Sequence, residues 1–140
     1  MTDTLTPRAR SERMRRVRSK NTKPEITVRV LLRSLGYRYR LHGKNLPGKP
    51  DLVFPGRRKV IFVHGCFWHR HPDPTCGLAR MPKSRLEFWR PKLEGNRRRD
   101  LEKQERLKKL GWKFFIAWEC ELRDKAGLER RIKKFMSEKE

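Results

Sequence analysis

The 140-residue sequence has no long apolar run and few acidic side chains. A stretch of about 18 apolar residues is needed to cross a bilayer, and none occurs, so we expect no transmembrane helix. Residues 1–18 are polar and contain no apolar segment typical of a secretory signal. We therefore expect a cytoplasmic protein without a membrane partner.

Cysteine is scarce as well, with only three residues in the chain. An odd number argues against a closed disulfide framework and favours metal ligands or free thiols. Apolar residues make up 35% of the sequence. That fraction suits one small domain whose core would benefit from an added cross-link such as a bound metal.

Basic residues, in contrast, are abundant. Lys and Arg number 38 against 16 Asp and Glu, which gives a formal net charge of +22. Nucleic acid is the natural partner of such a surface, because neutralised phosphates release counterions. Charge alone fits a non-catalytic binder equally well. Residues 7–20 are very basic and helix-compatible, so they are expected either to order on DNA or to remain a basic tail. Residues 21–140 are predicted to form one domain.

Hydrophobic periodicity predicts a layered α/β domain with a mixed sheet flanked by helices. A helix is predicted to start at Thr22–Glu25, where Thr22 can cap and Glu25 occupies the capping-box position. A second helix over 85–110 is expected to break near Pro91 or Gly95. The remaining predicted elements are strands over 37–41, 51–54, 59–64 and 112–118 and a helix over 125–136.

Cysteine and histidine gather at the end of the 59–64 strand and in the irregular loop that follows it. Three of the four histidines lie there, flanked by two cysteines, and the third cysteine follows the last strand. These residues are His64, His69, His71, Cys66, Cys76 and Cys120. A Cys₃His set suits tetrahedral structural zinc, which predicts a site made by Cys66, His71, Cys76 and Cys120. The spacing fits inert buried cysteines with surface histidines about as well.

Asp51 at the start of a strand indicates a different metal. A carboxylate there, followed by a hairpin and a second buried strand, is a recurring arrangement for Mg²⁺-dependent phosphodiester cleavage. A structural aspartate in a turn is the alternative. His64 and His69 favour the catalytic interpretation because histidine exchanges protons near neutral pH. Glu25 fits both a capping role and a role in the same cleft.

Aromatic side chains form a third group. Phe67 and Trp68 are adjacent in the loop, and Trp89 lies in a basic helical stretch. Aromatics in basic surroundings can stack on bases or insert between base steps, although they can also plug a core. Trp112 and Trp118 lie on a predicted strand and are interpreted as core.

Four segments together resemble the very short patch repair (Vsr) endonuclease family. They read GKPDLVF over 48–54, VIFVHGCFWH over 60–69, EFW over 87–89 and GW to WEC over 111–120. The resemblance covers about residues 13–120. It implies a restriction-endonuclease-like fold and a nick on the 5′ side of the thymine in a T:G mismatch, with Mg²⁺ as cofactor.

The resemblance also implies roles for individual residues. Asp51 would bind Mg²⁺ together with the main-chain carbonyl of Val63, and His69 would be the general acid or base. His64 and Glu25 would hold phosphate and water. Zinc would be bound by Cys66, His71, Cys76 and Cys120, the aromatic wedge would be Phe67, Trp68 and Trp89, and residues 1–20 would clasp DNA.

Two features of the sequence differ from the patterns known for nucleases and for this family. Phe62, Val63 and His64 stand where a general nuclease motif has an acidic residue and a lysine, and the 71–76 loop is longer than expected for the family. Two alternatives therefore remain: a zinc-stapled DNA-binding module without catalysis, and a related nuclease with another DNA target. A monomer that contacts mismatch-repair proteins is expected by family analogy.

Overall fold

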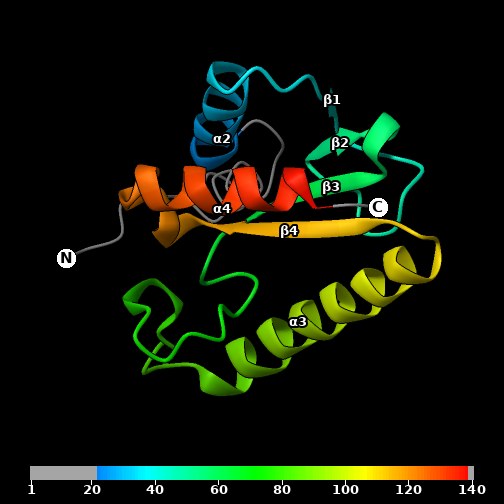
Figure 1. Cartoon of the computed structure of the whole chain (residues 1–140). Coiled ribbons are helices and arrows are strands. Elements are labelled where there is room, and N and C mark those ends of the chain that lie inside the picture. Colours follow the sequence, from blue (N-terminus) through cyan, green and yellow to red (C-terminus); the bar gives the residue numbers. More distant parts are fainter. Residues whose placement is uncertain (1–21, 139–140) are drawn as a thin grey trace.

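The computed structural model describes residues 22–138, so the predicted DNA-clasping segment over 1–20 lies outside the described part of the chain. Within 22–138, one four-stranded sheet is flanked by three α-helices (Figure 1). This arrangement confirms the predicted mixed α/β architecture. The more specific prediction, that this is a restriction-endonuclease-like fold, stays a prediction.

The sheet has the strand order β1-β2-β3-β4. Its strands are β1 (Arg40–Leu41), β2 (Leu52–Phe54), β3 (Lys59–His64) and β4 (Lys113–Trp118). The first two neighbouring pairs are antiparallel, and β3 and β4 are parallel. The β2–β3 hairpin is central, and all three residues of β2 are buried.

Only the end of the predicted 37–41 strand forms. The amide of Tyr37 donates a hydrogen bond to the carbonyl of Leu32, closing the end of the preceding helix. Because that N–H is already bonded to the helix, it cannot pair with a neighbouring strand. Tyr37 and Tyr39 still pack against the core, although only Arg40 and Leu41 pair with β2.

The first helix, α2 (Lys23–Ser34), begins as the sequence predicts. Thr22 is its N-cap and accepts a hydrogen bond from the amide of Glu25 through its hydroxyl. Gly36 follows the helix with a φ of 85°, a left-handed conformation that glycine adopts without steric cost. The last helix, α4 (Lys125–Ser137), also matches its prediction.

The predicted break in the second helix is wrong. α3 (Leu86–Lys109) runs through both Pro91 and Gly95. Pro91 lies in the second turn and is exposed, as is Glu87, whose carbonyl loses its helical donor and can be solvated instead. Gly95 costs only about 1 kcal/mol relative to alanine in a helix interior, too little to end a 24-residue helix.

The sheet separates two apolar clusters. One face packs against α2 and α4, with Leu32, Ile61 and Ile132 fully buried in that cluster. On the other face, Phe62 and Leu107 join β3 to α3. Figure 1 shows the same layering, with α3 on the opposite side of the sheet from α4. None of the helices in the described residues is long and apolar enough to span a membrane.

Lys59, at the start of β3, is 1% exposed. Its ammonium donates hydrogen bonds of 2.9 and 3.0 Å to the carbonyls of Phe135 and Met136, and a third bond to the carbonyl of Glu138. These carbonyls belong to the C-terminal end of α4, where the helix dipole favours a cation. The lysine therefore fastens α4 to the edge of the central hairpin.

We predict that Lys59→Met lowers the free energy of unfolding by roughly 2–4 kcal/mol, because the buried carbonyls would lose their charged donor. Urea denaturation followed by circular dichroism measures the change. Lys133→Met provides a control on the same helix, since Lys133 is exposed, and it should change stability by less than about 0.5 kcal/mol. Equal stability of the two variants would contradict this account of Lys59.

Candidate active site and metal cluster

The β2–β3 hairpin holds Asp51 at the floor of a cleft of about 860 Å³. Asp51 precedes β2 directly, and its Oδ2 accepts a 2.7 Å hydrogen bond from the backbone amide of Val63 on β3. The connection before it packs closely, because a Cβ on Gly48 would lie 3.0 Å from the ring of Phe62. The carboxylate is thus held beside the backbone amide of Val63. The metal-binding role predicted for the Val63 carbonyl stays a prediction.

Burial changes the proton affinity of Asp51. The pKa of Asp51 is raised from 3.8 to about 6, chiefly by desolvation and in smaller part by the nearby carboxylate of Glu25, although the hydrogen bond from the Val63 amide opposes the shift. An ionised Asp51 is therefore costly in the folded protein. A cation bound at the carboxylate would relieve that cost.

Glu25 faces the same region and is only 2% exposed. Its Oε1 lies 2.7 Å from Nη2 of Arg29 and 2.7 Å from Nε2 of His42. Its own backbone amide is capped by Thr22, so capping and a position in the cleft are compatible. The i, i+4 spacing of Glu25 and Arg29 on a helix is enough to predict their contact. Nothing in the sequence linked His42 to Glu25.

His64 and His69 stack in the cleft, with ring centroids 3.8 Å apart. Burial and the neighbouring His69 hold the pKa of His64 well below its usual value, so His64 is neutral at physiological pH. Its Nδ1 is buried and has no hydrogen-bond partner within residues 22–138. A buried nitrogen without a partner indicates a place for a ligand or water.

His69 is oriented by a residue that the sequence analysis missed. Nδ1 of His69 lies 2.6 Å from Oδ2 of Asp100 on α3. Asp100 stands in a charged helical run, where it looks like an ordinary surface residue. A carboxylate on one imidazole nitrogen leaves Nε2 as the nitrogen that can exchange a proton.

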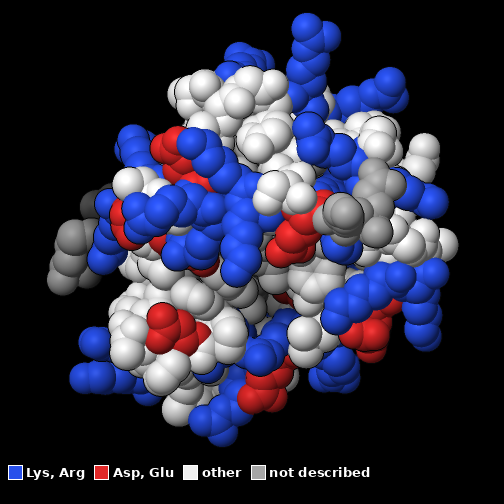
Figure 2. Space-filling model, viewed as in Figure 1, with Lys and Arg blue, Asp and Glu red and all other residues white. Residues whose placement is uncertain are grey.

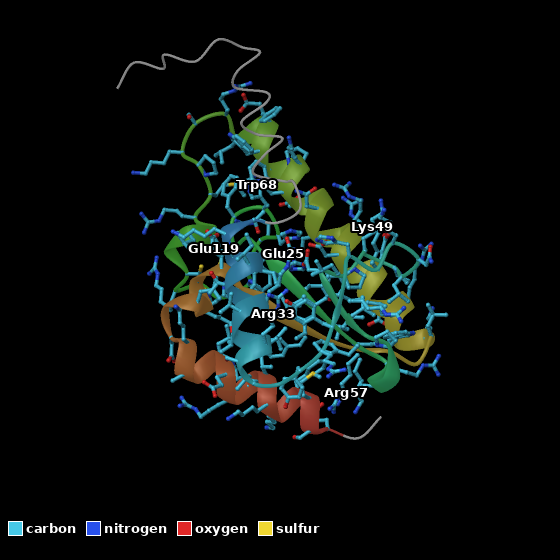
Figure 3. All side chains as sticks on the ribbon, turned by 90° about the horizontal axis from the view of Figure 1, so that it is seen from above. Glu25, Arg33, Lys49, Arg57, Trp68 and Glu119 are labelled. Atoms are coloured by element: carbon cyan, nitrogen blue, oxygen red, sulfur yellow. The ribbon has the colours of Figure 1, made fainter. Side chains whose placement is uncertain are left out.

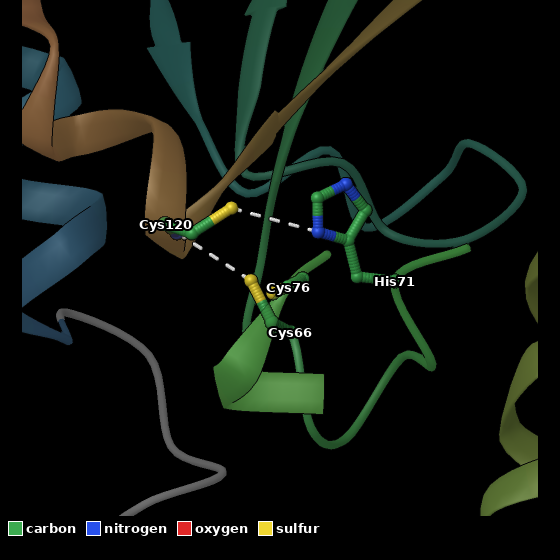
Figure 4. Close-up of side chains that lie close together, drawn as sticks. All are labelled: Cys66, His71, Cys76 and Cys120. Carbon is green, nitrogen blue, oxygen red and sulfur yellow. Dashed lines mark hydrogen bonds between the residues drawn. The ribbon is translucent and has the colours of Figure 1, made fainter. Parts of the chain in front are cut away.

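The four residues predicted to bind zinc converge beside the end of β4 (Figure 4). One ligand atom from each lies within 4.8 Å of all the others. Sγ of Cys120 is 3.5 Å from Nδ1 of His71, and the amide of Cys120 donates to Sγ of Cys66 at 3.4 Å. Cys76 completes the group from the loop between β3 and α3. Three sulfurs and one imidazole in this arrangement can hold a metal ion.

Trp118 contacts both clusters, which corrects its interpretation as a core residue. Its ring stacks on His71 at 4.3 Å and meets His64 edge-on at 5.2 Å. It is only partly buried, because the end of β4 points toward the loop instead of the core. Trp112, at the other end of the strand, does pack against the apolar cluster under α3.

The rings of Phe67, Trp68 and Trp89 contact one another, with centroid separations of 5.1, 5.4 and 5.9 Å. Lys92 places its ammonium 6.0 Å from both tryptophan rings. Phe88, which the sequence analysis did not select, packs on Trp89 and is 45% exposed. In Figure 3, Trp68 and Glu25 lie at the same end of the molecule. The aromatic cluster therefore borders the cleft.

Comparison with known proteins identifies the family. The model of the family described as DNA mismatch endonuclease Vsr matches residues 2–74. A type II nicking enzyme from Xanthomonas oryzae is 54% identical over 136 residues, covering 97% of this chain and 98% of the relative. The DNA mismatch endonuclease Vsr of Escherichia coli is 41% identical over 128 residues, covering 91% and 80%. The chain belongs to the Vsr family.

A further relative, a type II nicking enzyme of Neisseria meningitidis, is 41% identical over 138 residues and covers 99% of this chain. The family and these names confirm the prediction of an endodeoxyribonuclease. They leave the alternative of a DNA-binding module without catalysis unsupported. For this Vsr-family chain, the roles of the individual site residues stay predictions.

The raised pKa of Asp51 predicts a specific pH dependence of stability. Between pH 4 and 6 the folded protein holds a proton that the unfolded chain releases, so stability should fall as pH rises through this range. Asp51→Asn removes the titration and retains an acceptor for the Val63 amide. In magnesium-free buffer the free energy of unfolding of the variant should exceed that of wild type by up to about 3 kcal/mol at pH 7.5. The two free energies should be equal near pH 4.

Urea denaturation at several pH values measures this difference. Parallel pH profiles for wild type and Asp51→Asn would contradict the burial of an ionisable Asp51. Adding Mg²⁺ at pH 7.5 should reduce the difference in free energy of unfolding between the two proteins, because a cation bound at the carboxylate stabilises only the wild type.

Proposed function

We propose that this Vsr-family chain is a Mg²⁺-dependent endonuclease that nicks one DNA strand on the 5′ side of the thymine in a T:G mismatch. One observation carries the proposal. The half-buried Asp51 carboxylate, which accepts a hydrogen bond from the Val63 amide, shares a cleft with the stacked histidines and the aromatic cluster. The cleft thus combines groups for phosphodiester hydrolysis with rings that can contact bases.

Asp51 and the main-chain carbonyl of Val63 would hold the Mg²⁺, which prefers oxygen ligands and supplies charge neutralisation at the phosphate. The chemistry of the site fits such an ion, because a desolvated carboxylate beside a second buried carboxylate gains from a cation. Glu25 is kept in place by Arg29 and His42 and would orient water at the edge of the cleft.

His69 would carry out the proton transfer. Asp100 fixes Nδ1 of the ring, so Nε2 would accept a proton from the attacking water or return one to the leaving oxygen. His64 is neutral at physiological pH, and its unpartnered Nδ1 would bond to the phosphate or a bound water. Stacking of the two rings keeps their orientations linked.

Recognition of the mismatch would use Phe67, Trp68 and Trp89 as a wedge between base steps, since a mismatched pair is cheaper to unstack than a matched one. Exposed basic residues of α3, among them Arg97, Arg98 and Arg99, would contribute sequence-independent phosphate contacts. Residues 1–20 would add a basic clasp. Specificity would therefore arise from the wedge, and much of the affinity from charge.

Zn²⁺ is the ion we propose for Cys66, His71, Cys76 and Cys120, because three thiolates and an imidazole suit it. Burial raises the pKa of the Cys66 thiol to about 12, so without a cation that sulfur would stay protonated. The ion would fasten the irregular loop to the end of β4. Its role would be structural, since four protein ligands leave no open position.

A strand-nicking assay tests the proposed reaction. On labelled duplexes with Mg²⁺, wild type should make a single nick 5′ to the mismatched thymine and leave the perfectly paired duplex intact. Asp51→Ala should lower the rate by at least about 1000-fold, because it loses the charge at the metal and phosphate. Asp73→Ala, at an exposed aspartate of the zinc loop, should retain nicking and provides the matched control.

Comparable nicking by Asp51→Ala would overturn the assignment of the active site. Equal nicking of matched and mismatched duplexes would leave the nuclease intact and favour another DNA target. Magnesium dependence is tested in the same assay by omitting the ion.

The zinc assignment has its own measurement. Mass spectrometric metal analysis of the purified protein should find about one zinc per chain, and Cys120→Ser should retain little and melt at a lower temperature. Thr75→Ala changes the same loop without removing a ligand and should keep the metal. A zinc-free wild type with an unchanged melting curve would refute a structural zinc site.

A further inference from the structure

β4 is an edge strand. Within residues 22–138 it pairs only with β3, through six residue pairs in parallel. Alternate N–H and C=O groups on its other side therefore point away from the sheet. At about 3.3 Å per residue, the six residues present an edge roughly 20 Å long.

A groove of about 460 Å³ lies along the first half of this edge, between the C-terminal ends of α3 and α4. Its apolar lining comes from Trp112, Phe114, Phe115 and Phe135. Phe114 and Phe115 point to opposite faces of the sheet, and both are only partly buried. An added strand would thus find a backbone edge with an aromatic contact on each side.

The borders of the groove are mostly basic. Lys108 of α3 and Arg131 and Lys134 of α4 line it, against a single acidic residue, Glu138. Figure 2 shows uncharged surface below α4, with Lys and Arg on both sides and acidic side chains between them. Glu121 pairs with Arg131 and Glu105 with Lys108, but Lys134 adds a further exposed positive charge. The local field therefore favours an anionic segment.

This groove is distinct from the active site. β3 and β4 run parallel, so the pair Lys59–Lys113 lies at the groove end and the pair His64–Trp118 at the cleft end. Figure 3 shows Arg57, which contacts the end of α4, far from Trp68 and Glu25. DNA seated in the cleft leaves the β4 edge with no assigned role.

We propose that the β4 edge is a docking site for an acidic, extended peptide segment of a partner protein, which adds to the sheet as a fifth strand. Backbone pairing along β4 provides affinity, and the aromatic lining and basic borders select apolar and acidic side chains at alternate positions. A second copy of this chain fits poorly, because two edges meeting would oppose their basic borders. The strand geometry favours a peptide over nucleic acid, which has no backbone amides to pair.

Fluorescence anisotropy with a labelled eight-residue peptide of alternating glutamate and valine tests the proposal. Wild-type protein should bind it, and a peptide in which lysine replaces glutamate should bind at least about tenfold more weakly, since charge reversal opposes the basic borders. The double variant Arg131→Glu/Lys134→Glu should lose at least tenfold in affinity for the acidic peptide. Nicking should stay at the wild-type rate.

The matched control is Arg130→Glu/Lys133→Glu, which makes the same charge change on the same helix outside the groove. Both double variants lose one surface ion pair, Arg131–Glu121 or Lys133–Glu129, so their melting temperatures should be comparable. The control should keep peptide affinity within about twofold. Equal losses in the two variants would mean nonspecific charge attraction and would overturn the proposal.

Hydrogen exchange separates strand addition from surface attraction. With the acidic peptide bound, outward-facing amides of residues 114–118 should exchange more slowly, whereas amides of β1, at the opposite edge, should be unchanged. Absence of protection along β4, or stronger binding of a single-stranded thymidine oligonucleotide to the same groove, would refute a peptide-docking edge.

Discussion

β3 and β4 run side by side in parallel, and both the cleft and the candidate metal site depend on this pairing. His64 lies opposite Trp118 at the end of the two strands. Cys66 and Cys120 lie two residues beyond His64 and Trp118. The backbone amide of Cys120 donates a 3.4 Å hydrogen bond to Sγ of Cys66. Residues 54 positions apart in the sequence are thus brought to one group of candidate metal ligands. The same ends carry His64 into the cleft beside Asp51, so the strand register aligns the two sites together.

Folding of this chain includes unfavourable electrostatics in the cleft. Asp51 and Glu25 are carboxylates close enough to raise the pKa of Asp51, and both are largely withdrawn from water. A cation bound between the two carboxylates would offset their repulsion and desolvation and so would stabilise the folded chain. Elsewhere the chain satisfies buried charge internally, as Lys59 does at the end of α4.

Much of the fold could be predicted from local patterns. The cap at Thr22, the β-branched run of β3 and the apolar stripe of α4 each depend on near neighbours, and each element formed where it was predicted. Predictions failed where tertiary context or solvation decided. The amide of Tyr37 closes a helix instead of joining the sheet, and exposure of Pro91 lets α3 continue.

The sequence by itself determined the chemistry available to this protein: a basic surface, a Cys₃His set, and an aspartate with two histidines near buried strands. These depend on side-chain type and spacing, which are local properties. Only the tertiary structure decided the partners of those groups. Asp100 and His42 came to His69 and Glu25 through helix and sheet packing over 31 and 17 residues. Contacts across such distances depend on how the layers pack, and no local pattern encodes that.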